Sequence, residues 1–178
     1  VYIADEEHRE EGGTPAIVES VRAGLVFQLK DSVGAELIEE REEVFVQRAL
    51  KSWTANPNIH VLGNPDLPRL SIISFVIRHG KKNLHHDFVV AVLNDLFGIQ
   101  SRGGCSCAGP YGHRLLHIDL DQSRAFEASI VHGCNGIKPG WVRVGFNYFF
   151  SDTVADYVIE AINLIAEHGW KLLPLYLF

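Results

Sequence analysis

The stretch LSIISFVIR, residues 70–78, decides the expected fold. Its β-branched and apolar residues occupy both faces, which is typical of a central strand buried on both sides. A turn over residues 80–83 separates this strand from a helix expected over residues 84–97. Apolar residues recur at four-residue spacing through that helix, and Gly98 ends it. We therefore expect a buried strand that is followed directly by a helix packed against it.

Further segments are expected to extend this sheet and to cover it. Residues 141–148 alternate, with Val142 and Val144 on one side and Arg143 on the other. Short strands are expected over residues 59–62 and 99–101. Helices are expected around residues 111–120, 122–132 and 152–168. We predict an α/β fold, more closely an α+β small domain, in which two or three strands form one small sheet covered by helices.

The N-terminal part has a different organisation. Residues 1–54 are expected to form a connecting segment and a long helical arm, and residues 55–178 the small α/β domain. Thr14-Pro15 is typical of a helix N-cap followed by proline at the first helical position. Helices then follow over residues 16–30 and 31–53. The second of these carries a run of glutamates, which indicates a solvated face.

The composition limits the classes of partner and compartment. The chain has 178 residues, of which 47% are hydrophobic, and a formal net charge of −6. The acidic balance argues against nucleic acid as a partner, because phosphate binding requires a basic face. The apolar runs are too short to span a membrane. Three cysteines outside a small secreted framework indicate an intracellular compartment, the cytoplasm or the mitochondrion. Because the chain starts without methionine and ends on LLPLYLF, we expect a piece of a longer polypeptide.

The sequence RGGCSCAGPYGH, residues 102–113, concentrates reactive groups in a glycine-rich loop. Glycine lets the backbone approach a ligand closely, so such loops often carry chemistry. A nucleophilic thiol needs a lowered pKa, which a nearby cation supplies, and Arg102 precedes Cys107 by five residues. Cys107 is therefore a candidate nucleophile. The alternative is an inert cysteine in the protein interior.

Two positions outside this loop suit anion binding. Arg143 lies on the polar face of an otherwise apolar strand, where its guanidinium could hold a carboxylate through two hydrogen bonds. An ordinary exposed arginine is the alternative. The segment Gly12-Gly13-Thr14-Pro15 opens a helix, where free backbone N–H groups and a hydroxyl favour a phosphate. A plain helix cap is the alternative there.

A metal site is a rival interpretation of the cysteine loop. The spacing of one residue between the first two cysteines is tighter than in zinc knuckles, and no second paired motif follows. The side chains that could in principle bind zinc are Cys105, Cys107, His113, His117, His132 and Cys134.

Taken in order, these segments resemble a known family. The segments EGGTP (11–15), RGGCSCA (102–108) and WVRV (141–144) are similar to the C-terminal portion of class V aminotransferases. These are fold-type I enzymes that use pyridoxal 5′-phosphate (PLP) and include cysteine desulfurases and selenocysteine lyases. The resemblance implies the fold of their C-terminal domain, an amino-acid substrate and a homodimer. It is strongest to the desulfurase branch, whose loop reads Arg-x-Gly-x-x-Cys-Ala.

The resemblance also implies roles for single residues. Thr14, with Gly13 beside it, matches the threonine that reaches the cofactor phosphate of the partner subunit. Cys107 matches the thiol that attacks the substrate sulfur and becomes a persulfide. Arg143 matches the arginine that holds the substrate α-carboxylate, and Arg102 matches the cleft arginine that opens the loop. No metal is implied.

Two departures from the family pattern leave alternatives open. Cys105-Ser106 stands where family members often have histidines, so aminotransfer or another lyase reaction is an alternative to desulfuration. The family's cofactor-binding lysine lies in a Ser-x-His-Lys-like segment, and no lysine of this chain has that context. We therefore expect the large PLP-binding domain to be absent from this chain and the chain alone to be inactive. A non-catalytic module, with or without a metal, is a further alternative.

Overall fold

The computed structural model describes residues 3–105 and 109–176, apart from the side chain of Asn135. The chain divides into two compact units, Val1–Glu40 and Arg41–Phe178, each of which is considered by itself. The division falls inside helix α3 (Ala35–Ala55). The second unit therefore takes in the C-terminal part of a helix that the sequence analysis assigned to the arm, because its apolar side chains are buried in that unit's core.

The first unit contains helices α1 (Glu6–Glu10) and α2 (Ile17–Val33) and the beginning of α3. Neither α1 nor α2 has a buried residue. The expectation that Thr14 is the N-cap of α2 is wrong, since the helix starts at Ile17 and its N-cap is Ala16. The Ile17 N–H donates to the Pro15 carbonyl at 2.8 Å, and this turn delays the start of the helix.

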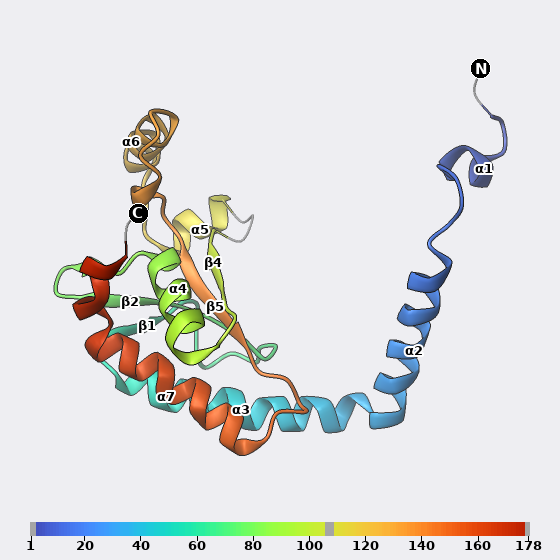
Figure 1. Cartoon of the computed structure of the whole chain (residues 1–178), viewed down its shortest axis with the longest axis horizontal. Helices are drawn as coiled ribbons and strands as arrows, with labels where there is room; N and C mark the ends of the chain where they lie inside the picture. The colour runs from blue at the N-terminus through green and yellow to red at the C-terminus, as the bar shows by residue number, and fades with distance from the viewer. Residues whose placement is uncertain (1–2, 106–108, 177–178) are drawn as a thin grey trace. The chain divides into compact units, whose positions relative to one another are not determined.

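The second unit is built on an antiparallel sheet with the strand order β1-β2-β5-β4 (Figure 1). A short strand, β3 (Lys82–Asn83), forms a hairpin with β2. The described part of the chain thus has more strands than the two or three expected, and β2 is central as predicted. The four strands in the order β1-β2-β5-β4 have the bounds β1 (Ile59–Val61), β2 (Ile72–His79), β4 (Arg102–Gly104) and β5 (Trp141–Gly145).

Strand β4 starts later than the sequence analysis expected. A strand was expected over residues 99–101, but the Ile99 N–H donates to the Leu93 carbonyl at 3.0 Å. This bond closes the C-terminal cap of helix α4 (His86–Phe97), in which Gly98 adopts a left-handed conformation with φ +64°. Ile99 is therefore tied to the helix end, and pairing with β5 begins only at Arg102.

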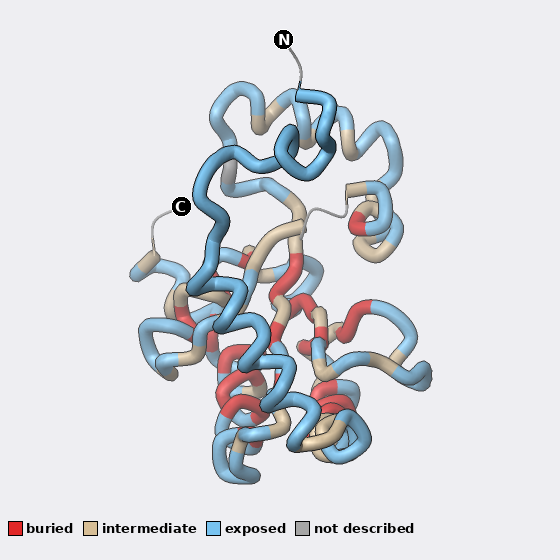
Figure 2. Tube along the Cα trace, turned by 90° about the vertical axis from the view of Figure 1, so that its right-hand side faces the viewer, coloured by how far each residue is buried: buried red, intermediate tan, exposed pale blue. Residues whose placement is uncertain are grey.

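One face of the sheet packs against α3, α4 and α7 (Asp152–His168) and forms the main core, whose residues are among the red, buried segments of Figure 2. Alternate residues of β2 and β5 point into it, which confirms the alternation predicted for the β5 segment. Burial on both faces of β2, also predicted, is found only in part, because the opposite face of the sheet is less covered. Trp53 of α3 is fully buried, and its indole N–H donates to the Ile159 carbonyl of α7 at 3.2 Å. The sheet side chains in this core are Ile59, Val61, Ile73, Phe75, Ile77, Val142 and Val144.

The opposite face of the sheet is only partly covered. A small cluster of Leu62, Val76 and Trp141 lies there, with Leu115 and Leu116 packed against it. Helices α5 (Gly109–Leu115) and α6 (Leu120–Val131) and the short helix η1 (Asn135–Ile137) form the connection from β4 to β5. A final 3₁₀ helix, η2 (Gly169–Leu175), follows α7. Arg102 and Arg143, two of the candidate site residues, lie on this same face of the sheet.

Candidate functional site

Two predicted site residues lie side by side on this partly covered face. Arg102 of β4 is the direct cross-strand partner of Arg143 of β5, and Arg143 is in turn the partner of Ser74 of β2. Residues directly opposite in antiparallel strands project to the same face with their Cβ atoms about 5 Å apart. Arg102 and Arg143 therefore form an arginine pair on the face opposite to the main core.

The arginine pair has an unbalanced charge. Within residues 3–105 and 109–176, neither guanidinium forms an ion pair or a hydrogen bond with a protein group. Arg102 is exposed and Arg143 is half-buried. Like charges that face each other across strands repel. An anionic ligand that accepts hydrogen bonds from both guanidinium groups would relieve this repulsion, so the arrangement suits the binding of a carboxylate or a similar anion.

Each arginine is held by a different part of the fold. Arg143 lies in β5, between two neighbouring strands, and the residues on either side of it, Val142 and Val144, are buried in the main core. Arg102 lies at the edge of the sheet, in a strand whose other members are Gly103 and Gly104. A Cβ atom at Gly103 would lie 3.1 Å from a methyl carbon of Val90. The glycine thus lets β4 approach α4 closely.

The remaining predicted residues have different outcomes. Cys107, the candidate nucleophile, lies outside the described residues. Cys105 is half-buried and packs against the small cluster that contains Trp141. Thr14 and Gly13 are exposed in the loop before α2, in the first unit, where Gly13 has φ +143°. The structure therefore brings together Arg102 and Arg143 and leaves the other assignments as predictions.

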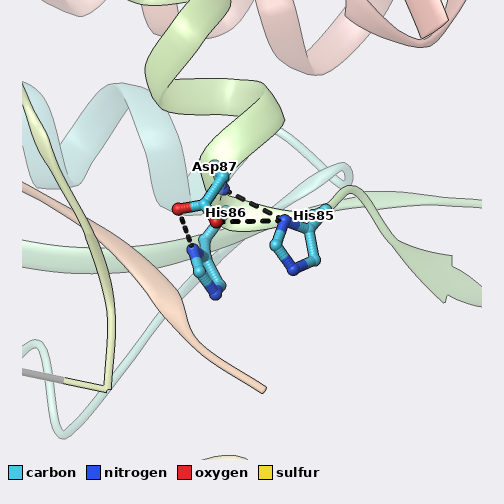
Figure 3. Close-up of side chains that lie close together, drawn as sticks. All are labelled: His85, His86 and Asp87. Atoms are coloured by element: carbon cyan, nitrogen blue, oxygen red, sulfur yellow. Dashed lines mark hydrogen bonds and ion pairs between the residues drawn. The ribbon is translucent and has the colours of Figure 1, made fainter. Parts of the chain in front are cut away.

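A cluster that the sequence analysis left without a role lies at the start of α4. His85, His86 and Asp87 place one ligand atom each within 4.8 Å of one another (Figure 3). His86 Nδ1 forms a hydrogen bond of 2.9 Å with Asp87 Oδ1, and the Asp87 N–H donates to His85 Nδ1 at 3.3 Å. Burial lowers the pKa of His85, and the neighbouring His86 lowers it further.

This cluster is a hydrogen-bonded helix cap, since His85 is the N-cap residue of α4. Both bonds that Asp87 makes with the histidines use the Nδ1 atoms of the rings. Position 85 holds none of the usual N-cap residues Ser, Thr, Asp, Asn or Gly, so the sequence carries no ordinary signal for this cap. In the described part of the chain, the candidate zinc ligands of the cysteine loop form no group of three with suitable distances.

A comparison with protein families places this geometry in context. Residues 1–150 match the model of the family described as Aminotransferase class-V. The chain belongs to this family. The resemblance inferred from the three motifs is thereby confirmed, and this family relationship carries with it an expectation of PLP dependence.

Curated relatives of this family member are cysteine desulfurases. The chain is 33% identical over 102 residues to a cysteine desulfurase of Escherichia coli O127:H6, a match that covers 57% of this chain and 23% of the relative. It is 26% identical over 116 residues to a probable cysteine desulfurase of Halobacterium salinarum, covering 65% of this chain and 26% of the relative. The chain thus spans about a quarter of the length of these relatives.

A solved structure confirms the fold. The apo structure of a cysteine desulfurase from Thermococcus onnurineus NA1 matches 93% of this chain and 35% of its own, with a TM-score of 0.64 and 19% identity. At this level of identity the match supports the α/β fold alone. Among the helices of the described residues, none combines the length and apolar character needed to cross a membrane.

Proposed function

We propose that this chain is the C-terminal part of a longer PLP-dependent enzyme of the cysteine desulfurase or selenocysteine lyase type. Two findings support the proposal: its curated relatives are desulfurases, and it spans about a quarter of their length. The enzyme acts in a reducing compartment, the cytoplasm or the mitochondrion, where a catalytic thiol stays reduced. The chain by itself is inactive, because the cofactor-binding lysine expected from the family resemblance has no match here.

The observation that carries this proposal is the arginine pair. The guanidinium of Arg143 holds the α-carboxylate of an amino-acid substrate through two parallel hydrogen bonds. Arg102, its cross-strand partner, adds a second positive charge on the same face. A substrate carboxylate bound between them would offset the repulsion of the two cations.

The start of α2 fits the phosphate of PLP. Ala16, the N-cap residue, makes no side-chain capping bond. The Ile17 N–H is taken by the Pro15 carbonyl, so the N–H groups of Val18 and Glu19 are the ones that an anion could bind. The Thr14 hydroxyl and the backbone at Gly13 lie in the exposed loop just before it. In a homodimer these groups would bind the phosphate in the partner subunit's site. When bound, PLP would act as an electron sink that stabilises a carbanion of the amino-acid substrate.

Cys107 supplies the nucleophile in this proposal. Its thiolate attacks the substrate sulfur, so that a sulfur–sulfur bond forms while the substrate carbon–sulfur bond breaks. The electron pair of the broken bond stays with the substrate carbon, and the enzyme is left with a persulfide on Cys107. The Cys105-Ser106 departure from the family pattern supports a second candidate, an aminotransferase or another lyase in which Cys107 takes no part.

The test uses the longer protein that contains this chain, loaded with PLP. Arg143→Gln is expected to raise KM for cysteine about 100-fold, since a hydrogen-bonded ion pair is lost. Arg124→Gln, on the exposed surface of α6, makes the same charge change away from the arginine pair and serves as the control. Cys107→Ser is expected to abolish persulfide formation. Full turnover in that variant favours aminotransfer, and an unchanged KM in Arg143→Gln contradicts the carboxylate assignment.

A second measurement distinguishes this function from a self-sufficient PLP enzyme and from a metal-binding module. Chain 1–178 mixed with PLP is expected to give no stoichiometric borohydride-reducible adduct at a single lysine, because the cofactor-binding lysine lies elsewhere. Stoichiometric zinc in the purified chain would favour the metal-binding module instead.

A further inference from the structure

His86 occupies an unusual position for a polar side chain. It is the first residue of α4 and only 5% exposed. Its Nδ1 atom is bonded to Asp87 Oδ1 at 2.9 Å, which fixes the orientation of the ring (Figure 3). Asp87 itself is largely exposed, so the pair joins a buried ring to a solvated carboxylate.

Two backbone segments lie directly against this ring, because each has a glycine at the point of contact. A Cβ atom at Gly103 of β4 would lie 3.1 Å from His86 Nδ1. A Cβ atom at Gly140, just before β5, would lie 2.5 Å from His86 Nε2 and 2.8 Å from the Cα of Gly104. Both distances at Gly140 are shorter than real Cβ contacts allow. The ring therefore lies where β4 and the start of β5 come together.

Strand β4 needs such an external support. It has three residues, two of them glycine, and among the strands of residues 3–105 and 109–176 it pairs with β5 alone. Glycine has no side chain that can be packed, so a glycine-rich strand specifies its pairing register weakly. A slip of one residue would turn Arg102 to the core face of the sheet and end its pairing with Arg143.

We propose that His86, oriented by Asp87, is a positioning residue that fixes the register of β4 on β5 and so keeps Arg102 opposite Arg143. The register part follows from the contacts of the ring, and the effect on catalysis rests on the proposed function. Loss of the ring releases β4, and the enzyme then binds its anionic substrate more weakly.

The experiment uses the longer protein and three variants. His86→Ala removes the ring, His86→Asn keeps an N–H donor near the position of Nδ1, and Asp87→Asn keeps the volume of the carboxylate at an exposed site where folding is not at risk. His168→Ala, at the exposed end of α7, is the matched control. Hydrogen exchange of backbone amides measures how often the pairing between β4 and β5 opens. Steady-state kinetics with cysteine measure substrate binding.

In His86→Ala, we expect exchange of the β4 and β5 amides to rise about tenfold while that of the β1 amides stays unchanged. KM is expected to rise about tenfold with little change in kcat, because Arg102 acts in binding. In His86→Asn, amide exchange and KM should both return most of the way to the wild-type values. In Asp87→Asn, both should lie between those of the wild type and His86→Ala.

Several outcomes would overturn the proposal. One is β4 exchange in His86→Ala that equals the wild type. Another is a uniform rise across the sheet that tracks a lower melting temperature, since that indicates a purely structural role. Faster β4 exchange with an unchanged KM refutes the link to Arg102. If the unmutated protein shows no turnover of cysteine, the proposed function fails, whereas a selective rise in β4 exchange still supports the register assignment.

Discussion

Replacing Trp53 with phenylalanine tests how α3 is joined to the core. Trp53 is fully buried, contacts the rings of Phe75 and Phe146, and donates to the Ile159 carbonyl. The substitution removes that hydrogen bond, which contributes about 1 kcal/mol. It also removes packing equivalent to roughly two or three methylene groups at about 0.8 kcal/mol each. We expect a loss of about 3 kcal/mol in the free energy of unfolding.

The assay is thermal unfolding of chain 1–178, followed by far-ultraviolet circular dichroism. A loss of this size corresponds to roughly 10 °C in Tm for a unit of this length. Leu37→Ala, in the same helix but 58% exposed, is the control and should change stability by less than about 0.5 kcal/mol. Equal effects of the two substitutions would refute the assignment of the C-terminal half of α3 to the core.

Three further predictions concern caps, protonation and charge. Gly98→Ala should lower the free energy of unfolding by about 1 kcal/mol in denaturant titrations, because φ is +64° at this cap. Burial and the nearby Arg78 lower the pKa of His60 below 6.5, so the unfolded chain binds its proton first as the pH falls. The corresponding stability is present above pH 6.5 and is lost as the pH falls through the folded-state pKa. His60→Gln should flatten the dependence of Tm on pH as the pH falls below about 6.5. Arg48 pairs with Asp152 at 2.7 Å on the surface. Arg48→Met should therefore change Tm measurably only at low ionic strength.

The elements of the fold could be predicted where the sequence pattern is periodic and local. Strand β2 and the C-terminal end of α4 followed from an apolar run and from Gly98. The details that failed depend on hydrogen bonds between segments. The Ile99 bond to Leu93 delays β4, and the Pro15 turn delays α2. No pattern in the sequence separates these residues from their neighbours.

The candidate site could likewise be predicted in part, where its residues depend on local sequence pattern. Alternation along residues 141–148 placed Arg143 on the polar face of its strand, as observed. Its pairing with Arg102 depends on which strands are neighbours, and this requires the tertiary fold. His86 was passed over because a histidine beside a turn is usually a surface residue. Only its burial under two glycine-rich segments shows its importance.

The contact between His86 and these segments limits how this region can vary. Glycine is the smallest amino acid, so every missense change at Gly140 adds a carbon atom where the ring already lies. A change at Gly103 adds one 3.1 Å from the ring, which is tight enough that a neighbouring group must shift. Gly104, with φ +112°, disfavours any L-residue for a different reason, its backbone geometry. A saturation library over residues 102–140 should therefore be depleted of variants at these three positions and tolerant on the exposed surface of α6.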